Sequence, residues 1–137
     1  MKIKLIDFSE GGFIPPHRAH YNDAGADVYC PKDVFIGAGK IEVIPLGFGI
    51  EIPDGFMGLI YPRSGLAREG VICELPPIDS GYRGEIHAVV TNMTDEAVQI
   101  AKGIRIGQLV IQPIIIADFT DSLGETRDKG AFGSTGE

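Results

Sequence analysis

The chain has 137 residues, about the length of one domain, and 44% of them are hydrophobic, which is enough to form a buried core. No apolar run is long enough to cross a bilayer, and the N-terminus lacks the apolar region and cleavage site of a secretory signal. The net charge of −7, with no cluster of basic residues, argues against nucleic-acid binding. We therefore expect a cytoplasmic protein that binds neither membranes nor nucleic acids.

The 19 glycines and 9 prolines interrupt the chain every few residues, which leaves little room for long helices. Between these breaks, apolar and polar residues mostly alternate, which predicts half-buried strands around residues 40–44, 84–92 and 108–112. A turn is expected at Pro53-Asp54-Gly55. The three isoleucines at 114–116 predict a strand that is covered on both faces, in part by another subunit. The pattern as a whole indicates an all-β fold: a β-sandwich, jelly roll or barrel of short strands.

One short helix is predicted over residues 64–70. Ser64 is a suitable N-cap, and Gly70 suits the C-terminal stop. A helix N-terminus offers free N–H groups to an anion, while Arg63 adds a guanidinium suited to phosphate and Gly65 allows close backbone approach. The same residues would also make an ordinary capped helix with a surface arginine.

Two other regions contain polar residues of the kinds that catalysis uses. Residues 78–84 are expected to form the tip of a β-hairpin, where Asp79 would orient and deprotonate a water and Tyr82 would lie against a sugar or base. Asp27 follows a loop of small residues and suits a metal contact through water. Gln108, at the entry to a strand, would bind a phosphate or face solvent. Each of these residues, taken alone, also fits an ordinary turn or rim position.

The C-terminal residues from 120 onward are polar and glycine-rich, which is typical of a mobile tail. This tail also contains an arginine, two hydroxyl residues and one isolated aromatic ring, as if to close over a nucleotide. Phe132 would stack on a base. Arg127, Ser134 and Thr135 would hold phosphate oxygens.

The cysteines and histidines show no ligand spacing. Cys30 and Cys73 are far apart in the sequence, and we expect two free thiols. No role is assigned to the three histidines or to the neighbours of the first one; these unassigned residues are His17, Arg18, His20, Tyr21, Asn22 and His87.

Five segments, in order, resemble the five motifs of the trimeric dUTPase family. They are AGADVY (24–29), PRSGLA (62–67), IDSGYRGE (78–85), GIRIGQL (103–109) and GAFGSTG (130–136) with Arg127. The match runs from about residue 20 to the C-terminus, and five motifs in the family order are much stronger evidence than one. The resemblance implies a jelly-roll-like homotrimer that exchanges C-terminal arms, with a core at 1–119 and an arm at 120–137.

The activity implied by the resemblance is the magnesium-dependent hydrolysis of dUTP to dUMP and pyrophosphate, by attack of water on the α-phosphorus. Asp79 would be the general base, and Asp27 would contact, through water, a Mg²⁺ ion held mainly by the triphosphate. Each active site would take the hairpin from one chain, the phosphate-binding residues from a second and the tail from a third. The implied substrate-binding residues are Arg63, Ser64, Gly65, Ile78, Tyr82, Gln108, Arg127, Phe132, Gly133, Ser134 and Thr135.

Tyr82 would exclude a 2′-hydroxyl, and the hairpin backbone from Cys73 to Asp79 would recognise uracil. This chain departs from the family pattern in the same hairpin, because Cys73 replaces a frequent asparagine and Pro76-Pro77 replaces Gly-Val or Gly-Thr. The two prolines remove two backbone donors and stiffen the loop. Ala26 also replaces a larger residue in the first motif, which we expect to have no effect.

Two alternatives remain open. A dCTP deaminase would share the fold and the Pro-Arg-Ser segment, although the hairpin and the tail favour a dUTPase. Some phage members of the family act as regulators that bind a partner protein, but no inserted segment here provides a partner surface.

Overall fold

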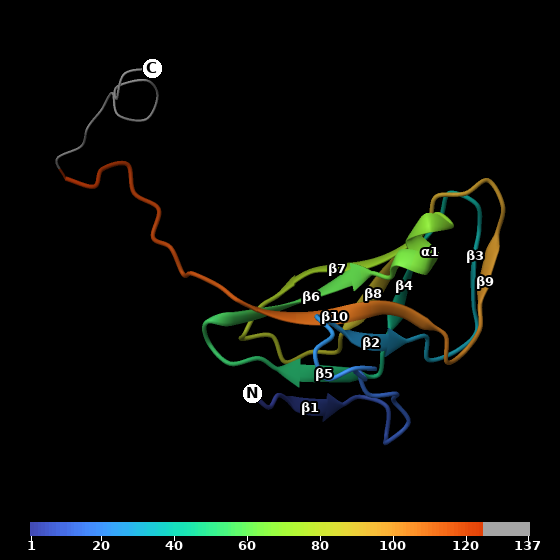
Figure 1. The fold of residues 1–137 in the computed structure, drawn as a ribbon, viewed down its shortest axis with the longest axis horizontal. Helices are drawn as coiled ribbons and strands as arrows, with labels where there is room; N and C mark the ends of the chain where they lie inside the picture. The colour runs from blue at the N-terminus through green and yellow to red at the C-terminus, as the bar shows by residue number, and fades with distance from the viewer. Residues whose placement is uncertain (125–137) are drawn as a thin grey trace, which may run out of the picture.

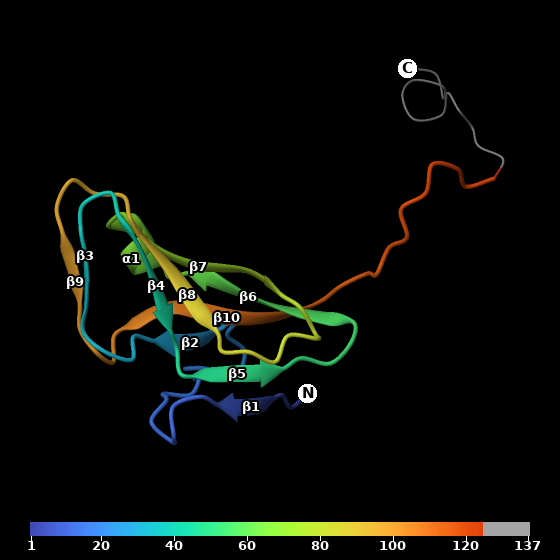
Figure 2. The ribbon, with the colours of Figure 1, turned by 180° about the vertical axis from the view of Figure 1, so that it is seen from behind.

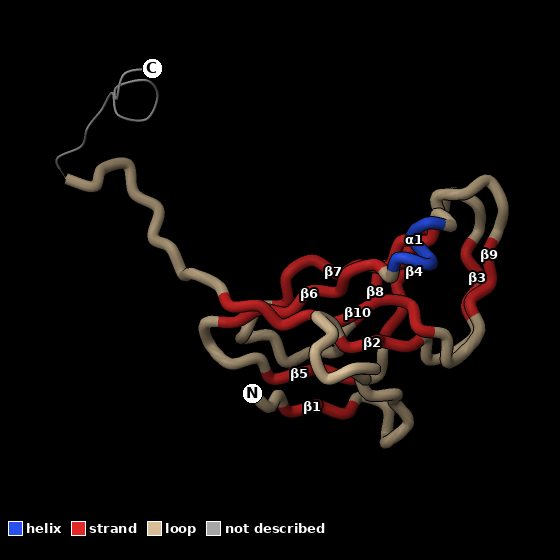
Figure 3. Tube along the Cα trace, viewed as in Figure 1, coloured by secondary structure: helices blue, strands red, loops and turns tan. Residues whose placement is uncertain are grey.

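The computed structural model describes residues 1–124, which form ten strands and one short helix (Figures 1 and 3). The elements in chain order are β1 (Lys4–Asp7), β2 (Ala26–Tyr29), β3 (Val34–Ile36), β4 (Ile41–Pro45), β5 (Phe48–Glu51), β6 (Phe56–Pro62), α1 (Ser64–Arg68), β7 (Val71–Ile78), β8 (His87–Asn92), β9 (Val98–Ile100) and β10 (Arg105–Pro113).

Six strands form one antiparallel sheet in the order β2-β10-β6-β7-β8-β4, and β1–β5 and β3–β9 form two further pairs. Both ribbon views show the sheets curled around one interior, with β3–β9 and α1 at the same end (Figures 1 and 2). The core contains side chains from the six-stranded sheet and from the β1–β5 pair, for example Phe48 of β5, Ile60 of β6 and Ile106 of β10. The predicted all-β fold with one short helix is therefore confirmed.

Sequence alternation identifies the buried face of β8 but not that of β4. In β8, Ala88 and Val90 are fully buried, as the alternation in residues 84–92 predicts. In β4, the alternating residues Ile41 and Val43 are 61% and 54% exposed, whereas Ile44 is buried. The ladder explains this difference because it pairs Ile44 with Ala88, so both side chains share the core face and their neighbours point outward.

The helix prediction is correct in place and wrong at the N-cap. The N–H of Ala67 donates to the carbonyl of Arg63 (2.9 Å), so Arg63 is the N-cap and Ser64 is the first helical residue. Gly70 ends the helix as predicted, with φ +86°. A helix of five residues has too few aligned peptides for a useful macrodipole. Any anion beside it must therefore be held mainly by side chains.

After β10, the chain leaves the body of the protein and carries no helix or strand between residues 114 and 124 (Figure 1). The predicted covered strand at 114–116 is therefore wrong for the single chain. Ile114 donates its N–H to the carbonyl of Gly55 (2.8 Å). Beyond it, Ile115, Ile116 and Phe119 are 91%, 78% and 98% exposed. These apolar side chains have no covering surface within residues 1–124.

Both cysteines are free and buried, as expected. Burial raises the pKa of the Cys73 thiol to about 12, so this group stays protonated and unreactive at neutral pH. Across residues 1–124, no helix has the length and hydropathy that a membrane span requires.

A buried side chain, Asn92, ties the β3–β4 turn to the β8–β9 turn at the end of β8. The two hydrogens of its amide nitrogen are shared among three carbonyls, those of Ile36 (3.1 Å), Gly37 (3.1 Å) and Glu96 (2.8 Å). Its carbonyl oxygen accepts from the backbone N–H (3.0 Å) and the hydroxyl (2.7 Å) of Thr94. The side chain is fully buried, and the carbonyl of Ile36, which is buried as well, depends on it rather than on water.

We expect Asn92→Ala to lower the free energy of unfolding by about 3 kcal/mol, because it leaves the buried carbonyl of Ile36 and several part-buried polar groups without this partner. Urea unfolding at a fixed protein concentration measures this change. Asp95→Ala, an exposed substitution in the same turn, is the control and should change stability by less than about 0.5 kcal/mol. Equal midpoints for the two variants would show that the Asn92 network does not stabilise the fold.

Candidate functional site

A polar cavity of about 320 Å³ lies where β2, β10 and the junction between β6 and α1 meet. It brings together four residues predicted from three separate motifs: Asp27, Arg63, Ser64 and Gln108. We call it the phosphate pocket, because it combines guanidinium, hydroxyl and amide donors at one point. Its full lining is Ala19, His20, Asp23, Ala24, Gly25, Asp27, Arg63, Ser64, Arg105 and Gln108.

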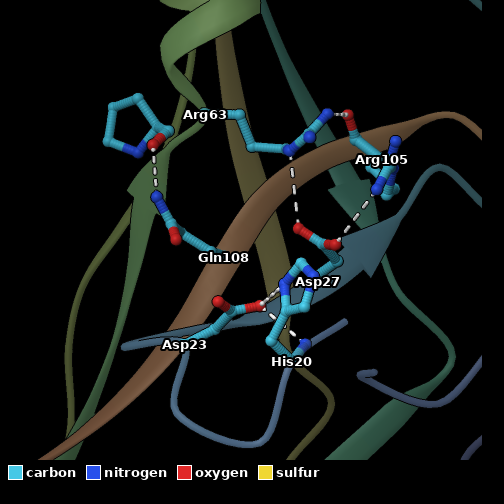
Figure 4. A network of polar contacts seen from close by, with 7 residues as sticks. His20, Asp23, Asp27, Arg63, Arg105 and Gln108 are labelled. Atoms are coloured by element: carbon cyan, nitrogen blue, oxygen red, sulfur yellow. Dashed lines mark hydrogen bonds and ion pairs between the residues drawn. The ribbon is translucent and has the colours of Figure 1, made fainter. Parts of the chain in front are cut away.

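Asp27 organises the phosphate pocket, because two arginines converge on its carboxylate (Figure 4). Arg63 Nε lies 3.4 Å from one carboxylate oxygen, and Arg105 Nη1 lies 3.6 Å from the other. Arg63 also donates through Nη1 to the carbonyl of Arg105 (3.3 Å). These contacts connect β2, β10 and the β6–α1 junction and orient both guanidinium groups before any ligand binds.

Gln108 lies opposite Asp27 in the β2–β10 ladder and donates through Nε2 to the carbonyl of Pro62 (3.0 Å). Gly25 makes room for it, since a Cβ at that position would lie 2.9 Å from both Cβ and Oε1 of Gln108. At the start of α1, Ser64 and Gly65 are exposed, and a Cβ on Gly65 would meet nothing within 4 Å. That side of the pocket is therefore open to a ligand.

A second cavity, of about 290 Å³, lies between the end of β7 and the start of β8. We call it the hairpin cleft. It contains the predicted residues Ile78, Asp79 and Tyr82, and the segment between Ile78 and His87 is a hairpin tip as expected. The N–H of Tyr82 donates to the carbonyl of Asp79 (3.0 Å), and its hydroxyl donates to the carbonyl of Glu85 (2.7 Å). The full lining is Leu75, Pro76, Pro77, Ile78, Asp79, Tyr82, Glu85 and His87.

The hairpin cleft opens because the β7–β8 ladder stops at the pair Glu74–Val89. Continuing that register by two residues would place Pro76 opposite His87. Ile86 uses its N–H and C=O on the other side, with Phe48 (2.8 Å) and Leu46 (2.9 Å), so the polar groups of His87 point toward β7. Pro76 has no N–H to donate to them, and the ladder cannot continue.

The two prolines also coincide with a β-bulge. The β6–β7 register shifts between the pairs Gly58–Ile78 and Ile60–Leu75, so β7 carries one extra residue there. The expectation that the prolines stiffen a loop is thus corrected: they lie inside strand β7. A bulge tolerates residues that donate no ladder hydrogen bond, which explains why a strand can hold both prolines.

The hairpin cleft and the phosphate pocket share no lining residue. Ile78 pairs with Gly58 near the start of β6, whereas Arg63 follows the end of that strand. Asp79 therefore lies level with Met57, six residues from Arg63, which at about 3.3 Å per residue is a separation of ~20 Å. Figure 1 shows the same arrangement, with α1 at one end of β6 and β7 running back toward the other. One chain does not bring Asp79 to its own phosphate pocket.

Residues 1–124 contain no cluster of three or more His, Cys, Asp or Glu side chains that would hold a metal ion. Both oxygens of Asp27 face guanidinium groups, an arrangement that fits contact with a cation through water rather than direct coordination. The predicted tail residues Arg127, Phe132, Gly133, Ser134 and Thr135 lie outside the described residues.

Sequence reasoning missed three residues that line the phosphate pocket: His20, Asp23 and Arg105. Arg105 lies in the fourth motif, three residues before Gln108, and its position opposite Tyr29 beside a bulge in the β2–β10 ladder turns it toward Asp27. His20 and Asp23 lie in the loop directly before the first motif. Only their closeness to Asp27 along the chain could have identified them as pocket residues.

An all-β chain with an arginine-lined polar pocket and a separate cleft beside an acidic residue is of the class of proteins that suit a phosphorylated ligand. Comparison with known families narrows this class, since residues 13–136 match the dUTPase family model. The chain belongs to the dUTPase family.

Curated relatives match over nearly their whole length. The deoxyuridine 5′-triphosphate nucleotidohydrolase of Clostridium tetani is 42% identical, over 100% of this chain and 97% of the relative. The protein of the same name from Rhizobium johnstonii is 44% identical, over 98% and 93%.

Solved structures share the fold. A dUTPase variant from phage 80alpha superposes with a TM-score of 0.83 at 25% identity, over 95% of each chain. A mutant dUTPase from phage phi11 of S. aureus, which coordinates a structural Mg(II) ion, has a TM-score of 0.82 at 24% identity, over 90% of this chain and 98% of that one.

Gly25→Ala should weaken the binding of inorganic pyrophosphate roughly tenfold, because the added methyl group displaces Gln108 from its contact with Pro62. Isothermal titration calorimetry measures this affinity. Gly37→Ala is the matched control, since its Cβ meets only the flexible side chain of Lys40 (3.2 Å), and it should bind like the wild type. Unchanged affinity in Gly25→Ala would show that Gln108 does not need this space.

Proposed function

We propose that this protein is a dUTP diphosphatase that hydrolyses dUTP to dUMP and pyrophosphate with magnesium, and that it acts in the cytoplasm. The observation that carries this proposal is the pair of sites in a dUTPase-family chain. Asp79 lies at a cleft of suitable size for a nucleobase, and Arg63, Ser64 and Gln108 lie together in the phosphate pocket.

Uracil would be recognised by the backbone of the hairpin cleft. The N–H and C=O of His87 point toward β7, where Pro76 provides no N–H to pair with them. Uracil presents an N3–H donor between two carbonyl acceptors, which complements a C=O beside an N–H. Cytosine has a lone pair at N3 and would place it against the carbonyl of His87. This arrangement therefore favours dUTP over dCTP without the asparagine found in many relatives.

Asp79 would act as the general base. It is exposed at the rim of the hairpin cleft, so a water molecule can reach its carboxylate. The water oxygen would bond to the α-phosphorus as its proton passes to Asp79, and the bond to the α,β-bridging oxygen would break and release pyrophosphate. Arg63, Ser64 and Gln108 would stabilise the charge that develops on the phosphates, and Tyr82 would lie against the deoxyribose.

Magnesium bound to the triphosphate would supply the positive charge that this acidic chain lacks. Asp27 would hold the hydrated ion only through water, because both of its oxygens face arginines. Arg63 and Arg105 would keep that carboxylate fixed while the substrate enters the pocket.

Each active site would be shared between chains of a homotrimer. Support comes from the separation of ~20 Å that strand geometry imposes between Asp79 and Arg63 of one chain. Ile115, Ile116 and Phe119 are apolar and exposed, which supports packing of this segment on a second copy of the chain. The arm at 120–137 would follow it. Arg127, Phe132, Gly133, Ser134 and Thr135 would then close the site from a third chain, over a core of residues 1–119.

The activity is tested by measuring pyrophosphate release from dUTP, dCTP, dTTP and UTP in parallel, with magnesium and with EDTA. We expect kcat/KM for dUTP to exceed the other values by at least about 100-fold, because mismatched polar groups in the hairpin cleft carry a large penalty. EDTA should abolish release. Ammonia release from dCTP would instead indicate a deaminase, and no release from any substrate would overturn the proposal.

Site sharing is tested by mixing two inactive variants, Asp79→Asn and Arg63→Ala, through unfolding and joint refolding. Each alone should lose at least about 100-fold in kcat. In random mixed trimers, about a quarter of the sites would combine an intact hairpin with an intact phosphate pocket from a different chain, and activity should return.

The matched control mixes Asp79→Asn with Tyr82→Ala. Both changes lie in the hairpin, so every hairpin in the mixture carries a defect and no activity should return. Equal recovery in both mixtures, or recovery in neither, would contradict a site shared between chains.

A further inference from the structure

The loop before β2 forms one wall of the phosphate pocket and has no part in the mechanism above. A turn closes it, in which the N–H of Asp23 donates to the carbonyl of His20 (3.1 Å) and the N–H of His20 donates back to Asp23 Oδ2 (2.9 Å). Arg18 Nε donates to the carbonyl of Asp23 (2.8 Å). These three bonds hold His20 and Asp23 at the pocket whether or not a ligand is present.

The ring of His20 is oriented by the same carboxylate. Its Nδ1 lies 3.3 Å from Asp23 Oδ2, and Figure 4 shows this contact. Because a charged carboxylate only accepts hydrogen bonds, the contact favours the forms of the ring that carry a proton on Nδ1. The backbone N–H of His20 lowers the pKa of Asp23, which favours the charged carboxylate that this contact needs. The second ring nitrogen, Nε2, has no hydrogen-bond partner within residues 1–124, and the imidazole side chain is 77% exposed.

The charges around the phosphate pocket nearly cancel without this histidine. Arg63 and Arg105 contribute two positive charges, but Asp23 and Asp27 contribute two negative ones, and both arginines lie against Asp27. A neutral pocket attracts a triphosphate poorly. An imidazolium at His20 would give the lining a net positive charge.

We propose that His20, as an imidazolium oriented by Asp23, is a further phosphate-binding residue of the pocket and donates through Nε2 to a phosphate oxygen of dUTP. This inference rests on the proposed function. The neutral ring would keep its proton on Nδ1 and present a lone pair at Nε2, which repels a phosphate oxygen. The contribution of His20 to binding should therefore decrease as pH rises.

The other charged groups near His20 come from each neighbouring element. They are Arg18 and Asp23 of its own loop, Asp27 of β2, Arg63 before α1 and Arg105 of β10. Among these residue types, histidine is the one that ordinarily changes charge between pH 6 and 8. The terminal phosphate of the ligand also titrates in this range, so the effect of the protein must be read from the difference between variants.

The test measures the Kd of the non-hydrolysable α,β-imido analogue of dUTP by calorimetry at pH 6.5 and pH 8.5. We expect His20→Gln to bind about tenfold more weakly than the wild type at pH 6.5 and nearly equally at pH 8.5, because a charge-assisted bond to phosphate is lost only where the ring is protonated. In turnover at the lower pH, KM should rise while kcat stays close to the wild-type value.

His17→Gln is the matched control. His17 is also exposed, and it pairs with Asp27 through backbone hydrogen bonds that the substitution retains, so this variant should bind like the wild type at both pH values. Deoxyuridine, which has no phosphate, should inhibit the wild type and His20→Gln equally. Thermal unfolding of each variant checks that the fold is unchanged.

Equal binding of wild type and His20→Gln at both pH values would overturn the inference. Equal weakening at both pH values would also overturn it, because the effect would not depend on the imidazolium. If the wild type itself failed to bind the analogue, the proposed function would be wrong, whereas the other outcomes leave that function intact.

Discussion

The length of β6 is the constraint on which the rest of this structure depends. The strand has seven residues, and the ladder fixes Ile78 beside its beginning while Arg63 follows its end. Side-chain rotation cannot close the resulting gap of ~20 Å, and bending the strand would break its ladders with β10 and β7. The hairpin cleft, which suits a nucleobase, and the phosphate pocket are therefore held apart within one chain. An exposed apolar segment after β10, at the end of the sheet where the hairpin lies, is consistent with a chain that functions as part of an assembly.

Within the phosphate pocket, the contact of Asp27 with two arginines both orders the site and reduces its positive charge. Asp27 holds Arg63 and Arg105 in place, so less side-chain entropy is lost when a ligand arrives. The carboxylate also offsets the positive charge that a triphosphate requires. Such a pocket needs additional positive charge from another source. A magnesium ion on the substrate and a protonated His20 would each supply it. Asp27 thus fixes the geometry of the two arginines, while the positive charge that an acidic ligand needs has to come from these other sources.

The sequence predicts local features well and relations between strands poorly. Gly70 as a helix stop, the hairpin tip after Ile78 and the buried face of β8 follow from residue type and spacing alone. The exposure of Ile41 and Val43 does not, because it is set by the ladder between β4 and β8.

The residues of the candidate site show the same difference between local features and relations between strands. Motif order identifies Asp27, Arg63, Gln108 and Asp79, and the family resemblance already implies that Asp79 lies apart from the other three, as the two cavities of one chain have it. His20 and Arg105 join the site through tertiary contacts, which spacing within a motif does not encode. Only the strand order, with β10 between β2 and β6, brings Asp27, Arg105 and Arg63 together.

The proline pair shows how a departure from the family pattern can retain a site. Pro76 cannot donate, and the bulge at Pro76 and Pro77 displaces β7 from regular pairing. The polar groups of His87 consequently stay unpaired within the hairpin and free to meet a base. The loss of two donors, which looks like damage to base recognition in the sequence, therefore leaves the polar groups of His87 available at the hairpin cleft.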